Sequence, residues 1–265
     1  MAVMRPVQPV RPVAPYVGGK RNLAKRLITR IEQIPHGTYA EAFVGMGGVF
    51  LRRRTAPRAE VINDYSRDVA TLFRVLQRHY VAFVEMLRYQ ITTRADYERL
   101  LATDAATLTD LERAARFLYL QRLAFGGKVS GRSFGVSPQR PARFDVTRIE
   151  GMLAELHERL AGVVIECLPY DSFIERYDRK TTLFYLDPPY WGSESDYGKE
   201  MFAPADFERL AGILKAIKGR FILSLNDTKE VRELFAAFDI EAVETTYHIG
   251  GGAKAKRASE LIISN

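Results

Sequence analysis

The sequence predicts an α/β protein whose mainly parallel sheet is interrupted by a mainly helical insertion, and three observations support this. A strand, a glycine turn, a helix and a second strand ending in an acid follow one another over residues 39–64. Apolar residues then recur at helical spacing over residues 67–162. Strand patterns return at residue 163. The chain of 265 residues is long enough to bury one large core with such an insertion.

The N-terminal residues 1–14 are predicted to form an extended, mobile arm, because prolines at 6, 9, 12 and 15 prevent regular structure. The stretch lacks the apolar segment of a signal peptide. No apolar run approaches the ~20 residues that a transmembrane helix needs, so we expect no membrane association. Asn22–Ile34 carries a helical apolar stripe that Pro35 and Gly37 end.

The first part of the sheet is expected over residues 15–66. Tyr39–Val44 is a predicted strand, followed by a turn with three glycines, and Val49–Leu51 is expected to open a helix. Ala59–Asn63 is the next strand and ends in Asp64. The turn lacks the Lys-Ser/Thr of a phosphate-binding P-loop and does not complete a Gly-x-Gly-x-x-Gly motif. Asp64 is therefore either a ligand of ribose hydroxyls or the acid of a local Asx turn.

The insertion, residues 67–162, is predicted to be helical except near 124–138. There four glycines alternate with Lys128, Arg132 and Phe134, which indicates a loop or β-hairpin with basic and aromatic side chains at its tip. The rest of the sheet is expected over residues 163–265. Its predicted strands are Val163–Cys167, Leu183–Leu186, Phe221–Leu225, Ile240–Thr246 and Leu261–Ile263, and its predicted helices are Pro204–Ile217 and Lys229–Phe238.

Asp187-Pro188-Pro189-Tyr190, directly after the apolar run Leu183–Leu186, is the most informative motif. A strand that ends this way presents a carboxylate and a backbone carbonyl at the carboxyl edge of the sheet, where ligands bind in open α/β folds. Neither proline has an N–H, so the loop offers acceptors and almost no donors. Acceptors beside an aromatic face suit a planar group that carries an NH2, such as a nucleobase.

Another acid, Asp171, follows the predicted strand Val163–Cys167 and either lines the same pocket or caps a short helix. The only cysteine, Cys167, is expected to be a buried core thiol, which leaves no disulfide framework. The four histidines are far apart and have no partner at metal-ligand spacing, so we expect no structural metal. Together these features favour a reducing, cytoplasmic setting.

The net charge of +7 is unevenly distributed. Residues 1–30 hold seven basic residues and no acid, and residues 113–148 hold eight basic residues and one acid. These two segments carry +7 each, so the remainder of the chain carries about −7. Such a split indicates surfaces that face a polyanion, most simply nucleic acid.

With these motifs in order, the chain resembles the DNA adenine-N6 methyltransferases of the Dam type. The resemblance depends on Val17-Gly18-Gly19-Lys20, on Glu41 to Phe50 and on Asp187 to Tyr190, and it covers nearly the whole chain after residue 14. It implies a Rossmann-like, S-adenosylmethionine-dependent methyltransferase sheet with a DNA-recognition insertion. It also implies methylation of N6 of a flipped adenine in double-stranded DNA, within a specific sequence, as in restriction-modification systems.

The resemblance assigns roles to individual residues. Asp187 and the Pro188 carbonyl would accept from the adenine amine, and Tyr190 would stack on the base. The cofactor-binding residues it implies are Tyr16, Lys20, Phe43, Gly45, Gly47, Asp64, Asp171 and Asp187. The DNA-binding residues it implies are Lys128, Arg132, Phe134 (or Phe125), Arg140, Arg143, Lys254, Lys256 and Arg257, the last three in a basic loop over residues 250–257.

Two other functions remain compatible with the sequence. Cytosine-N4 methylation would use the same acceptor chemistry, since both reactions act on an exocyclic amine. A DNA-binding protein with a relict cofactor pocket is the alternative from a different class. Cys167 is misplaced for the nucleophile of cytosine-C5 methylation. We expect a monomer or a weak dimer.

Overall fold

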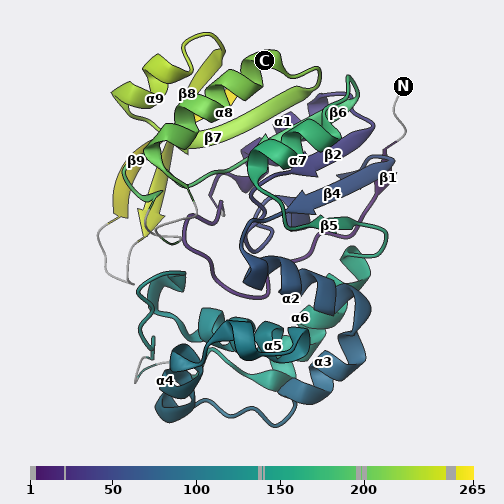
Figure 1. The fold of residues 1–265 in the computed structure, drawn as a ribbon, viewed down its shortest axis with the longest axis vertical. Helices are drawn as coiled ribbons and strands as arrows, with labels where there is room; N and C mark the ends of the chain where they lie inside the picture. Colours follow the sequence, from purple (N-terminus) through teal and green to yellow (C-terminus); the bar gives the residue numbers. More distant parts are fainter. Residues whose placement is uncertain are drawn as a thin grey trace.

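The structure is a computed structural model that describes residues 4–20, 22–136, 139, 141–194, 198, 202–248 and 255–265. It has an α/β half and a helical half at the opposite end of the molecule (Figure 1). The α/β half holds the strands β1 (Arg5–Pro6), β2 (Thr38–Glu41), β3 (Thr55–Ala56), β4 (Ala59–Asn63), β5 (Val164–Glu166), β6 (Thr182–Leu186), β7 (Arg220–Asn226), β8 (Asp239–His248) and β9 (Ala255–Ser264). Its helices are α1 (Ala24–Gln33), α7 (Tyr170–Tyr177), α8 (Pro204–Ala216) and α9 (Lys229–Leu234).

The helical half confirms the helical character predicted from residue 67 onward. Its helices are α2 (Arg67–Arg78), α3 (Tyr80–Leu87), α4 (Arg94–Ala102), α5 (Asp110–Leu123) and α6 (Val146–Arg159). A capping box at Thr109, which exchanges hydrogen bonds with Glu112, fixes the start of α5. The predicted loop or hairpin after α5 is a loop with a short 3-10 turn, Phe125–Gly127, and a single antiparallel bridge between Ala124 and Phe134. Within the described ranges, no helix has the length and apolar character required to cross a bilayer.

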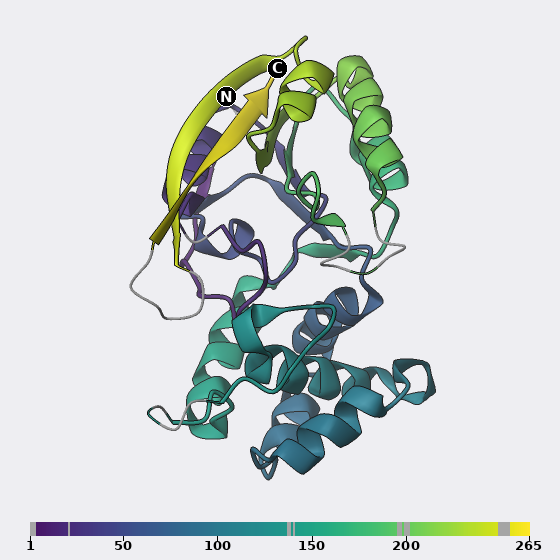
Figure 2. The same ribbon diagram turned by 90° about the vertical axis from the view of Figure 1, so that its left-hand side faces the viewer.

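The sheet of seven strands has the order β5-β4-β2-β6-β7-β9-β8 and confirms the predicted α/β class. The strands from β5 to β7 are parallel, and β9 runs antiparallel to both of its neighbours. Side chains of β6 alternate between two hydrophobic clusters: Leu183 and Tyr185 face one, Phe184 and Leu186 the other. Figure 2 shows that α1 lies on one side of the sheet, with α7 and α8 on the other. A strand buried on both faces reads as a continuous apolar run, which is why β6 is recognisable in the sequence.

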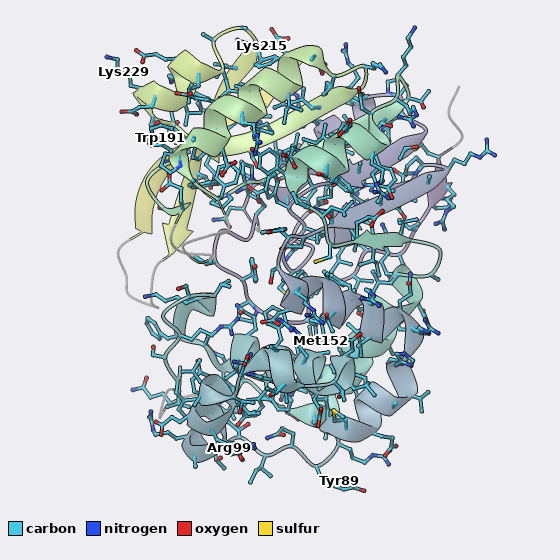
Figure 3. All side chains as sticks on the ribbon, viewed as in Figure 1. Tyr89, Arg99, Met152, Trp191, Lys215 and Lys229 are labelled. Carbon is cyan, nitrogen blue, oxygen red and sulfur yellow. The ribbon has the colours of Figure 1, made fainter. Side chains whose placement is uncertain are left out.

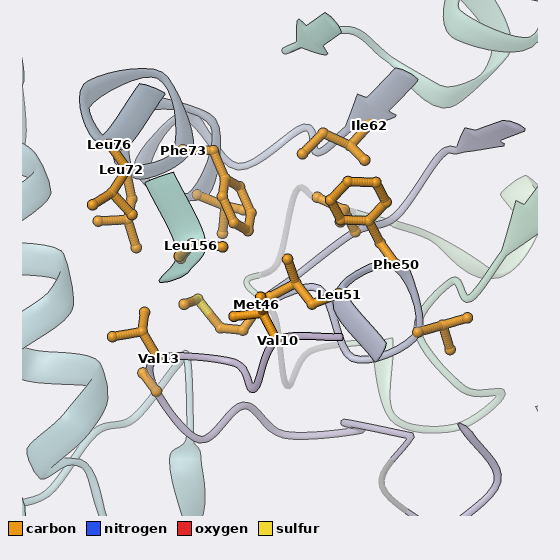
Figure 4. Packing of buried hydrophobic residues seen from close by; sticks show 14 of the residues in the cluster. Val10, Val13, Met46, Phe50, Leu51, Ile62, Leu72, Phe73, Leu76 and Leu156 are labelled. Carbon is orange, nitrogen blue, oxygen red and sulfur yellow. The ribbon is translucent and has the colours of Figure 1, made fainter. Parts of the chain in front are cut away.

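Residues 4–14 are extended, as expected, but they are packed against the core and do not form a mobile arm. β1 pairs with β3, and the backbone of Val10 bonds to Leu51 over 2.8 Å. Val10 and Val13 are buried beside Met46 and Leu51, as Figure 4 shows. The regular proline spacing correctly indicates extended backbone. It does not indicate that the valines between the prolines pack against the core.

Three local expectations are wrong. The helix expected from Val49 is a single 3-10 turn, Phe50–Arg52, because Arg53 already has extended backbone. Cys167 is exposed, since β5 is an edge strand and the residue follows its end. Residues 255–257, expected in a basic loop over 250–257, belong instead to β9 and pair with β8, whereas residues 250–254 lie outside the described residues.

A buried ionic cluster connects the helical half to the sheet. Glu60 of β4 accepts hydrogen bonds from Arg53 (2.9 Å) and from Arg159 of α6 (2.7 and 2.9 Å), and all three residues are buried. The Arg53 guanidinium lies 3.7 Å from the centre of the Tyr39 ring. Glu60 is the carboxylate that both guanidiniums share in this cluster. With its charge removed, two buried cations are left uncompensated.

We therefore expect Glu60→Gln to lower the free energy of unfolding by about 3–5 kcal/mol, the cost of breaking a buried ion pair. Urea denaturation of the two proteins measures this difference. The matched control is Glu98→Gln, which removes an exposed ion pair with Arg94 at 3.9 Å and should cost roughly 0.5 kcal/mol or less. Equal losses in the two variants would contradict the role of the buried cluster.

Candidate active site

The candidate site lies at the carboxyl edge of the sheet, at the point where successive strands change from one side of β2 to the other. β2 is flanked by β4 and β6, and the chain forms β4 and β5 on one side before it returns to β6 on the other. Ligands of open α/β sheets bind in the crevice at such a switch point. Here the crevice is a cavity of about 930 Å³, lined by the N-terminal segment, by the ends of these strands and by the first turn of α7.

The cavity brings together most of the residues that the sequence assigns to the cofactor. Those that line it are Tyr16, Lys20, Phe43, Gly45, Asp64, Asp171 and Asp187. Gly47, Pro188 and Tyr190 are not among its lining residues, although each is next to one that is. The parallel arrangement of β2, β4 and β6 explains the convergence, because residues that follow these strands must meet at one edge.

The glycine turn after β2 lets the backbone approach the Tyr16 ring. Gly45 has φ +49°, and a Cβ on it would lie 3.0 Å from that ring. The Gly45 N–H donates to the Asp64 carboxylate over 2.8 Å, and Ser66 N–H donates to the other oxygen of Asp64 over 2.9 Å. Asp64 is therefore an Asx-turn acid that also lines the cavity, and burial raises its pKa to about 6. A Cβ on Gly47 would lie 2.7 Å from Leu51.

Phe43 and Tyr170 are aromatic residues that also line the cavity. The Phe43 ring lies 5.7 Å from that of Tyr170 and 6.0 Å from that of Phe202. Asp171 is in the first turn of α7, where its carboxylate accepts from the N–H of Ser172 over 2.6 Å. The N-cap residue of that helix is Pro169, so Asp171 does not serve as the cap. Its carboxylate also lies 3.4 Å from Arg209, at 31% exposure.

The carboxylate of Asp187, at the end of β6, is paired with a buried ammonium. Lys20 Nζ lies 2.6 Å from Asp187 Oδ1 and donates to the Tyr190 hydroxyl over 2.5 Å, while its side chain is only 2% exposed. Ser224 also donates to Asp187 Oδ1, over 3.1 Å. Burial raises the pKa of Asp187, and the charge of Lys20 acts against this rise.

Two prolines and an asparagine hold the loop that follows Asp187. Pro188 and Pro189 are buried. Asn226, at the end of β7, accepts from the Trp191 N–H and donates to the Trp191 carbonyl, both over 3.0 Å. The Lys20 ammonium lies 4.3 Å from the centre of the Tyr190 ring. Fixed φ angles and this two-point clamp restrict the positions of the loop's acceptors.

The basic residues assigned to DNA differ in their surroundings. Lys128 and Arg143 are exposed. Arg132 instead donates to Gln121 over 2.9 Å and lies 5.5 Å from the centre of the Phe117 ring. Gln121 in turn donates to the carbonyl of Pro15, so Arg132 takes part in the attachment of the N-terminal segment to α5.

Of the two aromatic residues in this loop, Phe134 is packed and Phe125 is open. The Phe134 ring lies 5.1 Å from that of Tyr97, with the Arg94 guanidinium 5.0 Å from its centre. Phe125 is 51% exposed. Arg140 and Lys254 lie outside the described residues. Lys256 and Arg257 are described only as backbone positions of β9, opposite Tyr247 and Thr246.

Three residues near Asp187 and the N-terminal segment were not anticipated from the sequence. They are Ser224, which bonds to Asp187; Gln121, which bonds to Pro15; and Glu260, which lies 3.8 Å from the Lys20 ammonium. The available signal is a polar residue in or next to a buried apolar strand or helix, as Ser224 is within Phe221–Leu225. Among the described residues, no group of three or more His, Cys, Asp or Glu side chains could hold a metal ion.

Comparison with known proteins identifies the family. The family model described as D12 class N6 adenine-specific DNA methyltransferase matches residues 16–249. The type II methyltransferase M.CviBI of Paramecium bursaria Chlorella virus NC1A is 23% identical, with 97% of this chain and 100% of that protein aligned. The type II methyltransferase M1.LlaDCHI of Lactococcus lactis subsp. cremoris is 25% identical over 97% of this chain and 95% of its own length.

A third relative carries the activity in its name. The retron Ec67 DNA adenine methylase of Escherichia coli is 24% identical to this chain, with 93% of this chain and 88% of that protein aligned. The match to the family spans every segment that lines the cavity except the residues before Tyr16. The chain therefore belongs to the D12 class of N6 adenine-specific DNA methyltransferases, enzymes that transfer the methyl group of S-adenosylmethionine to N6 of adenine in DNA.

Proposed function

We propose that this enzyme methylates an adenine that has rotated out of duplex DNA, with Asp187, Pro188 and Tyr190 as its catalytic residues. The observation that supports this most is the pair of acceptors at the end of β6, a partly buried Asp187 and a buried Pro188, beside a cavity that Asp187 and the glycine turn both line. In a duplex, N6 is engaged in the base pair, so the nucleotide must leave the stack before the amine can reach Asp187.

The cavity fits S-adenosylmethionine in size and in chemistry. Its volume is at the upper end of the range for small-molecule sites, which leaves room for a cofactor beside a base. We propose that Tyr16, Phe43 and the Gly45–Gly47 turn contact the methionine part, that Asp64 holds the ribose and that Asp171 lies near the cofactor adenine. When bound, S-adenosylmethionine supplies an electrophilic methyl group on a positively charged sulfur. Five acidic residues line the cavity, Asp64, Asp171 and Asp187 among them, and carboxylates suit that positive charge.

The acceptors would activate the amine by fixing its geometry. The lone pair of an aromatic amine is delocalised into the ring, so the amine is a poor nucleophile. Hydrogen bonds from the amine to Asp187 and to the Pro188 carbonyl favour a pyramidal nitrogen, whose lone pair is then free to attack. Ser224 and Lys20 both bond to Oδ1 of Asp187, so they orient the carboxylate at the end of β6. A water-poor site strengthens these bonds.

Tyr190 would hold the extruded base by stacking. The Lys20 ammonium occupies one face of the ring, at 4.3 Å from its centre, and its hydrogen bond to the hydroxyl fixes the ring's tilt. We propose that the base stacks on the opposite face. Stacking of a base on an aromatic side chain is worth about 1–3 kcal/mol, enough to offset part of the cost of unpairing.

We propose that residues 67–162 form the target-recognition insertion, with 15–66 and 163–265 as the catalytic domain. The insertion shares one hydrophobic cluster with α1 and the sheet, so it presents its surface at a fixed place relative to the cavity. Lys128, Arg140 and Arg143 would contact phosphates, together with Lys254, Lys256 and Arg257 from the β8–β9 end. Arg132 and Phe134 would act indirectly by supporting the loop, and Phe125 is the aromatic residue available to stack on a base.

We propose that the enzyme acts in the cytoplasm as a monomer or a weak dimer. One copy of the chain supplies every residue assigned to the cavity. Its one cysteine is compatible with a reducing compartment.

The proposed reaction is tested with S-adenosylmethionine tritiated in its methyl group and mixed-sequence duplex DNA. Label is expected in DNA, and nucleoside analysis of the digested product should place it in N6-methyladenine. Label in cytosine, or none in DNA, would contradict the proposal. Faster methylation of an adenine opposite a mismatch than of a paired adenine would support extrusion of the base, because less unpairing energy is then required.

We expect Asp187→Asn to reduce turnover at least ~10²-fold while DNA and cofactor binding change little, because the variant removes one preorganised acceptor. Single-turnover methylation and equilibrium binding measure the two effects. The matched control is Asp239→Asn, at an exposed position in the first residue of β8, which should leave the rate unchanged. A wild-type rate in Asp187→Asn would refute its catalytic role.

We expect Gly45→Ala to weaken S-adenosylmethionine binding by about tenfold or more, because its Cβ would displace the Tyr16 ring. The matched control is Gly162→Ala, where φ is +76° but nothing lies within 4 Å of the added Cβ. Both variants should lose roughly 1–2 kcal/mol of stability from left-handed backbone. Only Gly45→Ala should lose cofactor affinity in calorimetry without DNA. Equal affinity in the two variants would contradict the assigned cofactor position.

Replacing Lys128 and Arg143 by Gln should weaken binding to all duplexes and reduce the slope of log K against log salt by about 0.9 for each lost phosphate contact. Fluorescence anisotropy over a salt series measures this slope. Lys215→Gln is the matched control, because Lys215 is exposed at the end of the molecule opposite the helical half (Figure 3). A loss confined to one DNA sequence would instead assign these residues to base reading.

A further inference from the structure

Glu260 is a buried acid to which the mechanism described so far gives no role. It lies on β9, opposite Asn226 of β7 and Val243 of β8, and is 1% exposed. Neither of its carboxylate oxygens accepts a hydrogen bond with an acceptable distance and angle. Burial raises the pKa of Glu260, and the charge of Lys20 and then the Tyr190 hydroxyl act against this rise. A carboxylate left in this state costs the folded protein several kcal/mol.

The only cation within ion-pair distance of Glu260 among the described residues is the Lys20 ammonium, at 3.8 Å from Oε2. That ammonium is 2.6 Å from Asp187 and bonds to Tyr190, so the buried Glu260 and the partly buried Asp187 share one buried cation. The 3.8 Å separation is too long for a hydrogen bond. A movement of the ammonium by about 1 Å toward β9 would turn this ion pair into a hydrogen bond.

The position of Lys20 creates a competition at Asp187. A strong, charge-assisted bond holds the carboxylate that must accept from the neutral target amine. If Lys20 had no second acceptor, release of Asp187 would leave a buried ammonium with only the Tyr190 hydroxyl as partner, which is costly. A second carboxylate on the other side of the ammonium lowers that cost.

We propose that Glu260 is a positioning residue: it attracts the Lys20 ammonium and accepts its hydrogen bond when the target amine takes its place on Asp187. This inference rests on the proposed function, since it gives Asp187 an amine to accept from. Glu260 touches neither the base nor the cofactor in this role; it acts through Lys20.

Other charged or titratable groups also face Asp187, and each belongs to a different part of the fold. Glu41 at the end of β2 and Tyr185 of β6 interact with the Asp187 charge, in addition to Lys20, Tyr190 and Glu260. Burial raises the pKa of Glu41 to about 8, so this acid is largely neutral near pH 7. Replacing Glu260 therefore changes the ionic charge around Asp187 while leaving these other groups in place.

The test is Glu260→Gln, which keeps the shape of the side chain and removes its charge. Turnover should fall about 10- to 100-fold, because Lys20 then keeps its hydrogen bond to Asp187 and the carboxylate is poorly placed to accept from the target amine. The affinity for DNA should be unchanged. The acidic limb of the rate against pH should move to lower pH, because the loss of a nearby negative charge makes Asp187 easier to ionise. An unchanged rate and an unchanged limb would overturn the proposal.

A second measurement separates positioning from a merely structural role in the cofactor-free protein. Because burial raises the folded-state pKa of Glu260, its contribution to stability is full below its ordinary pKa and is lost as pH rises through the raised value. Gln has no such loss. Glu260→Gln should therefore equal or exceed the wild type in melting temperature at pH 8, although it is slower. A less stable, slower variant would indicate a packing role and overturn the proposal.

A double-variant cycle with Lys20→Met tests whether Glu260 acts through Lys20. If it does, adding Glu260→Gln to Lys20→Met should cause no further loss of turnover, since no ammonium remains to be positioned. An equal additional loss in both backgrounds would overturn the inference. Failure of the proposed function is distinguishable, because the wild type would then methylate no adenine, whatever the variants do.

Discussion

The buried ammonium of Lys20 is the interaction on which the site depends. A charge removed from water is tolerated only when opposite charges and hydrogen-bond acceptors surround it. Here these come from the end of β6, from the loop after it and from β9, while the lysine itself precedes α1. Segments that are more than 160 residues apart in the chain must therefore meet for the folded state to be stable. The same requirement places Asp187 and Tyr190 beside the cavity.

The features of the site that follow from local sequence patterns could be predicted. Acids after parallel strands converge because of strand direction alone, and Asp64, Asp171 and Asp187 do line one cavity. The continuous apolar run of β6 identifies a strand covered on both faces. What depends on tertiary packing was not predictable. The burial of Val10 and Val13 depends on the packing of the N-terminal segment against Met46 and Leu51, and the exposure of Cys167 depends on the place of β5 at the edge of the sheet.

The surroundings of a charged side chain are the feature that the sequence predicts least well. Arg132 and Lys128 belong to the same basic stretch, yet one guanidinium bonds to Gln121 inside the helical half and the other side chain is exposed. Composition counts both as potential phosphate contacts, because it does not distinguish a cation that stabilises a loop from one that faces solvent. Glu260 is the opposite case. In the sequence it is one acid next to an apolar run, and its proximity to Lys20 is seen only in the folded protein.

Three acids interact with one another at this end of the sheet, since Asp187 faces both Glu41 and Glu260. Glu41 and Glu260 are buried and Asp187 is partly buried, and removal from water raises the pKa of each. Apolar replacements at such positions are often neutral or stabilising, so the folded state alone does not require three carboxylates. Two hydrophobic clusters, one on each face of the sheet, supply the stability that offsets them. Because this support comes from outside the site, the acceptors at its centre can remain incompletely paired, which is the condition that the proposed acceptance of an incoming amine requires.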